Sequence, residues 1–238
     1  MTLPKLALLL LAVAPPFALT GCATGLDVAA GEPTTERRDI QEVSAVTLAS
    51  VGDLHISTGA EPSLTITAGD RVLDRVTSEV RDGTLVLDLE GRFLRNPGRI
   101  TYDLVLPEVD EIRLDGAGAV DADLAATDRL YVELAGAGDI TAHGVDVDDL
   151  TVRVDGAGSV TLAGRAGRQD VEIDGVGGYS GEDLTSAAAD VTIGGAGDAR
   201  VHVTDTLAAA VDGAGEIVHT GGARVTSSVS GLGAVRQG

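Results

Sequence analysis

The sequence predicts an all-β protein, a right-handed parallel β-helix (β-solenoid) built from coils of about 20 residues. A Gly-X-Gly motif recurs at nearly constant intervals through the second half of the chain. Apolar and polar residues alternate on both sides of each motif, which is the period of a strand with one buried face. The chain has 32 Gly, no Trp and two Phe, so small aliphatic residues must form the core, as suits the thin layers of a solenoid.

The glycine motifs lie 20, 20, 19, 20, 18 and 18 residues apart. They are Gly116/Gly118, Gly136/Gly138, Gly156/Gly158, Gly175/Gly177, Gly195/Gly197, Gly213/Gly215 and Gly231/Gly233. A fixed period indicates a repeat architecture, and the lack of helical periodicity between motifs excludes a βαβ fold. A β-propeller, the main alternative, needs a period about twice as long. Each unit is therefore predicted to be a strand, a sharp bend that glycine permits, a second strand and a turn.

Stacking the coils places equivalent positions above one another, ~4.8 Å apart. The inward positions then form continuous apolar columns, and Tyr179 falls in one of them. In one outward column Arg113, Glu133, Arg153 and Glu172 alternate in sign. We therefore expect Arg153 to lie between the two glutamates on neighbouring coils.

Two pairs of acidic residues fall on adjacent coils in outward columns, Asp155 with Asp174 and Asp198 with Glu216. Carboxylates at this spacing repel each other by roughly 0.8 kcal/mol even in water. Each pair is therefore a candidate for weak binding of a cation such as Ca²⁺, with a tolerated surface repulsion as the alternative. The nine-residue calcium-binding repeat of other β-helices is not present. We expect no cofactor.

The N-terminus reads as an export signal followed by an anchor. Residues 1–21 combine a positive Lys5 with a run of eight apolar residues over 6–13, as in a signal peptide. Leu19-Thr20-Gly21-Cys22 resembles the bacterial lipobox, which implies cleavage before Cys22 and acylation of that residue. An ordinary secretory signal with an incidental cysteine is the alternative. Residues 22–39 are interpreted as the lipidated Cys22 and a flexible tether, which would hold the exported domain on the cell membrane or the outer membrane.

Residues 40–238 are predicted to form one β-helix domain, with irregular first coils over 40–110 and regular Gly-X-Gly coils over 111–238. The strands expected in the irregular part are 43–51, 54–57, 64–67, 85–89 and 100–106. The segment 72–80 fits either a short helix or another strand.

The formal net charge of −20 disfavours binding to nucleic acid. The expected partners are the membrane, through lipidated Cys22, and a protein or other envelope component; homo-oligomerisation is left open. Arg92, Phe93, Arg95 and Arg99 gather three positive charges and an aromatic ring in the irregular region. Arg and aromatic residues are frequent interface anchors, so these four form a candidate contact patch. The alternative is a cap that covers the first coil.

The sequence does not predict an active site. His143 and His202 share a column but lie three coils apart. His202 and His219 lie on adjacent coils, but their distances in sequence from the nearest Gly-X-Gly motif differ by one, so their side chains should face opposite sides. That spacing does not build a metal cluster. No Gly-X-Ser-X-Gly motif occurs, and short uniform coils leave little chain for the walls of a cleft. We therefore predict that the protein is not an enzyme.

The lipoprotein start, the Asp-Gly-Thr-Leu stretch at 82–85, Leu106-Pro107 and the recurring Gly-Ala-Gly-Asp blocks together resemble the DUF2807 family, the head GIN domain of autotransporter adhesins. The resemblance covers residues 40 to 238. It implies an exported β-helical domain with no catalytic or ligand residues to transfer. The function expected is a non-enzymatic surface lipoprotein, a binding scaffold or adhesin-like module. The alternatives are an envelope-maintenance or sensing lipoprotein and a glycan-active β-helix enzyme.

Overall fold

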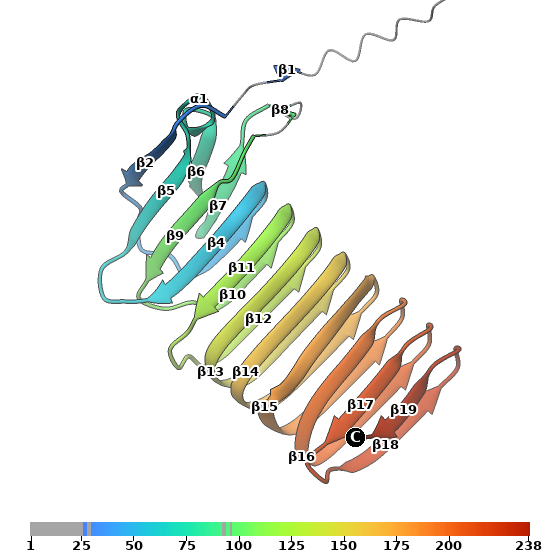
Figure 1. The fold of residues 1–238 in the computed structure, drawn as a ribbon. Coiled ribbons are helices and arrows are strands. Elements are labelled where there is room, and N and C mark those ends of the chain that lie inside the picture. Colours follow the sequence, from blue (N-terminus) through green and yellow to red (C-terminus); the bar gives the residue numbers. More distant parts are fainter. Residues whose placement is uncertain (1–25, 28–29, 92–93, 96) are drawn as a thin grey trace, which may run out of the picture.

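The computed structural model describes residues 26–27, 30–91, 94–95 and 97–238. It is a β-solenoid of about 6 turns with coils roughly 20 residues apart, which confirms the predicted fold class. Figure 1 shows the coils stacked as one rod, with the first strands at one end and the C-terminus at the other. Among the described residues, no helix has the length and apolar character needed to cross a membrane.

The regular coils pair in parallel, residue above equivalent residue. Their strands are β10 (Glu111–Leu114), β11 (Ala117–Asp123), β12 (Arg129–Leu134), β13 (Ala137–Val154), β14 (Ala157–Ile173), β15 (Val176–Ile193) and β16 (Asp198–Val211). Gly138 pairs with Gly118 on one side and with Gly158 on the other, so the glycine motifs lie directly above one another. The register read from the sequence is therefore confirmed in these coils.

The inward columns form a core that runs the length of the rod. Leu134, Val154 and Ile173 follow one another in one column, and each is fully buried. Burying such a side chain contributes about 1.5–3 kcal/mol. Because the equivalent residues of the adjacent coils lie directly above and below it, each coil is stabilised mainly by the coils on either side.

One polar group crosses this apolar interior. Tyr179 lies in the inward column where the sequence placed it, and its hydroxyl donates to Gln169 Oε1 at 2.9 Å. Gln169 Nε2 in turn donates to Ser186 Oγ at 2.7 Å. All three residues are at most 1 % exposed. Because each group has a partner, the network avoids the cost of an unsatisfied buried polar atom.

The glycine bends depend on both space and backbone conformation. Gly138 and Gly158 have φ values of +145° and +143°, which L-residues rarely adopt. A Cβ on Gly138 would also lie closer than 3.0 Å to the carbonyl oxygen of Gly118 in the preceding coil. Stacked backbones therefore occupy the place of a side chain at this corner, and glycine has a structural role there.

The irregular head begins the same solenoid. Its parallel strands are β3 (Ala45–Leu48), β4 (Val51–Thr58), β7 (Thr84–Leu89) and β9 (Thr101–Leu106). Gly52 pairs with Gly118, so a single glycine marks the first bend one coil before the repeats become visible in the sequence. The strand expected over 43–51 is interrupted at this bend.

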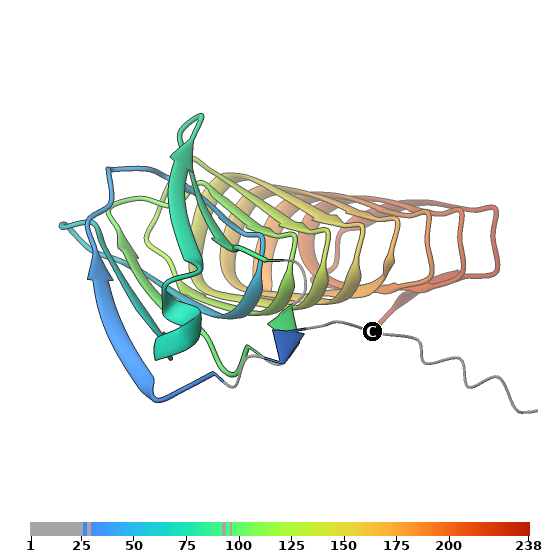
Figure 2. The same cartoon turned by 90° about the horizontal axis from the view of Figure 1, so that it is seen from above.

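Antiparallel strands then close the head. They are β2 (Pro33–Arg38), β5 (Ser63–Gly69) and β6 (Val76–Arg81), with β5 against β9 and β6 against β7. The helix α1 (Asp70–Leu73) buries Val72 and Leu73 against the core. Figure 2 shows α1, β2 and β5 gathered at this end of the rod. The segment 72–80 thus holds both the end of a helix and the start of a strand.

The predicted extent of the tether, 22–39, is wrong at its C-terminal end. Pro33–Arg38 is strand β2, which pairs antiparallel with β5. Arg38 Nη1 donates to the carbonyl oxygen of Val76 at 2.7 Å. The strand has no large apolar residue and most of it is exposed, so it shows no alternation that sequence reading could detect. Cys22 lies outside the described residues; β1 (Leu26–Asp27) pairs with β8 (Leu94–Arg95) beside the head.

The opposite end of the rod is formed by β17 (Glu216–Thr220), β18 (Arg224–Val229) and β19 (Ala234–Gln237). Within the described residues, β18 pairs with β16 alone and β19 with β17 alone.

Candidate functional site

The most developed outward feature is the charged ladder, defined as Arg113, Tyr131, Glu133, Arg153 and Glu172. Arg113 Nη1 lies 2.8 Å from Glu133 Oε2, and the guanidinium carbon of Arg113 lies 5.1 Å from the centre of the Tyr131 ring. The Tyr131 hydroxyl donates to Glu133 at 2.9 Å. Burial raises the pKa of Tyr131, and the hydrogen bond to Glu133 raises it further. The phenol therefore stays protonated and available as a donor.

The register of the ladder is the one expected. Arg153 pairs with Glu133 on one side and with Glu172 on the other. Its ion pair is made with Glu172, while Glu133 is engaged by Arg113. Sequence reasoning missed Tyr131, although it shares the outward parity of Glu133 two residues later.

Replacing Arg153 by glutamate should lower the free energy of unfolding by about 1–2 kcal/mol, because two favourable neighbours become repulsive in a partly exposed column. Arg153→Gln is the matched control, which removes the pair and adds no repulsion. Urea denaturation of both variants measures the difference. Equal losses would show that neither glutamate acts on position 153.

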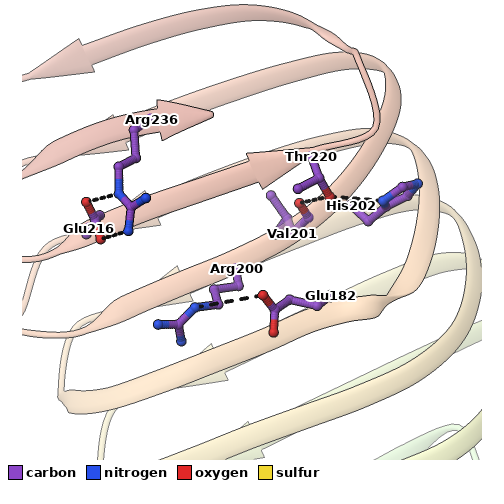
Figure 3. A network of polar contacts seen from close by, with 7 residues as sticks. All are labelled: Glu182, Arg200, Val201, His202, Glu216, Thr220 and Arg236. Atoms are coloured by element: carbon purple, nitrogen blue, oxygen red, sulfur yellow. Dashed lines mark hydrogen bonds and ion pairs between the residues drawn. The ribbon is translucent and has the colours of Figure 1, made fainter. Parts of the chain in front are cut away.

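The two acidic pairs predicted as cation sites, Asp198 with Glu216 and Asp155 with Asp174, have different surroundings. Asp198 and Glu216 are direct neighbours on adjacent coils, and the backbone N–H of Glu216 donates to Asp198 Oδ1 at 2.9 Å. Arg236 then binds both carboxylate oxygens of Glu216, as Figure 3 shows. Asp155 and Asp174 each begin a stacked glycine bend. Within the parts of the chain that the structure describes, no group of three or more His, Cys, Asp or Glu is arranged to hold a metal ion. Weak cation binding by either pair stays a prediction.

The Glu216 carboxyl should titrate below its ordinary value of 4.5, because the hydrogen bond from Arg236 lowers its pKa. A lowered pKa in the folded state contributes stability above the ordinary pKa, and this contribution is lost as pH falls through the lowered value. Arg236→Gln should return the pKa of Glu216 to its ordinary range, as measured by NMR titration. Arg200→Gln is the control, since Arg200 lowers the pKa of Glu216 by a smaller, purely coulombic effect. An unchanged pKa in Arg236→Gln would contradict the pairing.

The predicted contact patch is only partly described. Arg92 and Phe93 lie outside the described residues, and Arg95 is known only as part of β8. Arg99 Nε lies 3.8 Å from Asp53 Oδ2, with 84 % of the Arg99 side chain exposed. A surface recess of about 370 Å³ lies beside this segment, lined by residues that include Ser50, Asp88, Gly91 and Pro97. The patch stays a prediction.

Of the two histidines at the far end of the rod, His202 has a hydrogen-bond partner on the next coil. His202 Nδ1 and Thr220 Oγ1 are 2.9 Å apart, a contact between adjacent coils that Figure 3 shows. His219 pairs with Val201, one residue before His202, so the predicted offset of one is confirmed. His219 Nδ1 is buried without a hydrogen-bond partner in the described part of the chain. The contact of His202 links adjacent coils, and among the described residues neither histidine forms a hydrogen bond or ion pair with an acidic side chain.

Comparison with known proteins identifies the family of this solenoid. The family model described as "Putative auto-transporter adhesin, head GIN domain" (DUF2807) matches residues 43–223. The chain belongs to the DUF2807 family. The resemblance inferred from the sequence is thus confirmed, and the match of this DUF2807 chain spans both the irregular head and most of the regular coils. No curated protein matches the sequence.

Solved structures share the fold of this DUF2807 chain. A putative adhesin from Bacteroides fragilis is 23% identical with a TM-score of 0.82, over 87% of this chain and 97% of that one. A putative lipid binding protein from Parabacteroides distasonis is 18% identical with a TM-score of 0.70, and a putative adhesin from Parabacteroides merdae is 20% identical with a TM-score of 0.65. Both cover 87% of this chain and 97% of theirs. At these identities the likeness is one of fold.

Proposed function

We propose that the chain is a non-enzymatic, adhesin-like surface lipoprotein that binds a protein partner through the outward face of its coils. Membership of an adhesin-like family supports the adhesive role. The observation that carries the proposal is the charged ladder, where Arg113, Tyr131 and Glu133 are held by each other at the surface of a rigid sheet. A preordered Arg and Tyr lose little conformational entropy on binding and are typical anchors of protein interfaces.

The adhesive role can be tested on bacteria that display the full chain. Cells should be retained on wells coated with fibronectin, collagen or mucin at least ten-fold better than cells without the protein. The double change Arg113→Ala and Tyr131→Ala should abolish this retention. Arg200→Ala removes an arginine from the other limb of the coil and should leave retention intact. Retention that is absent on every coating, or that survives the double change, would contradict the proposal. Release of sugar from mucin would instead favour the glycan-active alternative.

The anchor is tested separately. Replacing Cys22 by serine should leave the chain unacylated and move it out of the membrane fraction, because acyl chains contribute about 0.8 kcal/mol per buried CH₂. Immunoblots of membrane and released fractions measure the distribution. Unchanged membrane partitioning of Cys22→Ser would contradict lipid anchoring, whatever the result of the adhesion assay.

A further inference from the structure

The tail edge, defined as strands β18 and β19, exposes the end of the core. Val225 continues the column of Leu207, and Val229 continues that of Val211. Leu207 and Val211 are at most 2 % exposed, whereas Val225 is 38 % and Val229 47 % exposed. Leu232, at the tip of the last glycine bend, is 93 % exposed. Val225 and Val229 therefore continue columns that are buried in the preceding coil, and both are open to solvent at this end.

The backbone of the tail edge is open as well. The N–H of Ser230 donates to the carbonyl oxygen of Val211 at 2.9 Å, so this residue directs its backbone toward β16. Successive residues of a strand direct their backbone groups to opposite sides. Val225, Ser227 and Val229 therefore present their N–H and C=O groups on the free side of β18. An edge of this kind is a template for another strand.

The head is closed to such an addition. There the strands β5 and β6 turn antiparallel to the solenoid, and Val72 and Leu73 of α1 cover the end of the core. A head-to-tail contact would repeat into a filament, and the described residues of the head offer no open end of the core for it to use. A tail-to-tail contact uses the same surface twice and closes after two copies.

Charge also singles out the tail. The whole chain carries −20, yet residues 217–238 contain two arginines and no Asp or Glu. The charge of Arg236 is taken up by Glu216 of the preceding coil. Arg224 is the first residue of β18, so an antiparallel copy of β18 would place the two Arg224 side chains at opposite ends of the pair, about 20 Å apart for six residues. Two acidic rods can therefore approach end to end with little repulsion.

We infer that the occupant of the tail edge is a second copy of this chain, with β18 of one copy running antiparallel to β18 of the other. The two rods then point away from each other. Cys22 is four residues before Leu26 of β1, at the head, so chain length alone keeps it within about 14 Å of that strand. If Cys22 is the lipid anchor of the proposed function, the two anchors lie at opposite ends of the dimer. The contact would join two facing membranes, as homophilic adhesion requires.

Cysteine cross-linking of the full chain tests the pairing. Thr226 lies in the middle of β18 and ends an outward column that includes Thr151, four coils away. Thr226→Cys should give a cross-linked dimer with a short bismaleimide in detergent solution. Thr151→Cys, in the same column, should not, and the parent chain with Cys22 alone gives the background. No dimer from Thr226→Cys, or an equal yield from Thr151→Cys, would overturn the inference.

A second variant separates edge pairing from proximity. Ser227→Pro removes an N–H on the free side of β18 and leaves the ladder to β16 intact, as proline is tolerated on edge strands. Added to Thr226→Cys, it should lower the dimer yield at least ten-fold. Ser227→Ala keeps the N–H and should leave the yield unchanged. Equal yields from the two variants would overturn strand pairing.

Mixing two populations of displaying cells tests the orientation. Mixed clumps should form, and Ser227→Pro on both populations should prevent them. Dimers in detergent without mixed clumps would uphold tail pairing and contradict surface display by the Cys22 anchor. Clumping that persists with Ser227→Pro would contradict the homophilic contact and leave adhesion to other proteins standing.

Discussion

Replacing Gly138 by alanine is expected to lower the free energy of unfolding by about 3–5 kcal/mol, the sum of backbone strain and overpacking. Gly138 has a φ of +145°, and its Cα faces the carbonyl oxygen of Gly118. A Cβ there must move backbone, because the neighbouring atoms are not the end of a flexible side chain. The moved backbone belongs to a stack, so the strain passes to the coils on both sides. Urea denaturation followed by circular dichroism measures the loss.

Ala137→Val is the matched control for this change. Position 137 is the outward tip of the same bend, and the equivalent positions carry Val176 and Leu232, both exposed. We expect a change of at most about 0.5 kcal/mol, as for other surface substitutions. Similar losses in Gly138→Ala and Ala137→Val would show that the bend is constrained by something other than the close approach of the backbones.

Replacing Gln169 by alanine should cost about 3–5 kcal/mol, because it leaves a cavity and removes the partner of two buried groups. Gln169 is fully buried and joins Tyr179 to Ser186. The column around it is apolar, with Leu150 on one side and Ala189 on the other. The measurement is again the midpoint and slope of urea unfolding.

A double-mutant cycle separates the cavity from the hydrogen bonds. Gln169→Leu fills the space and still leaves the Tyr179 hydroxyl unpaired, so we expect a loss of about 1–3 kcal/mol. Adding Tyr179→Phe removes that hydroxyl and should recover most of the loss. Ser186 keeps a contact to the carbonyl oxygen of His202 at 3.4 Å in either case. If the double variant is less stable than Gln169→Leu alone, the network stabilises the fold by more than the pairing of its buried polar groups.

The regular coils were predictable because their constraints are local and repeated. Each bend brings the glycine pair above an equivalent pair, and the alternation around it fixes which side chains point inward. The head was not predictable to the same extent, since the residues of β2 pair with residues of β5 that lie 26 to 36 positions later in the chain, and β2 carries no apolar stripe. Alternation identifies a strand that buries one face, but it does not identify the partner of that strand or the direction of pairing.

Side-chain interactions were likewise predictable only where the register of the coils determines them. The four charged residues of the charged ladder followed from register alone, because outward columns inherit the order of the coils, whereas Tyr131 was missed. The Gln169 network did not, since a glutamine in an inward column is recognisable only when its donor and acceptor partners are placed. The open tail was equally hidden, because Val225 and Val229 continue buried columns in the sequence and only the structure shows that they are exposed.

The coils also differ in length, and that variation is absorbed away from the glycine bends. The glycine bends stay paired from coil to coil, whereas the register shifts lie between Ala142 and Val145 and between Thr161 and Gly164. Where β15 meets β16 the register shifts at the same corner, between Gly181 and Thr185, and again shortly after it, between Ser186 and Ala188. Insertions and deletions acquired during evolution should therefore accumulate there and be excluded from the glycine bends. A foreign epitope grafted into this corner would be displayed as a loop at a chosen height along the rod, while the stacked backbone opposite keeps the coils in phase.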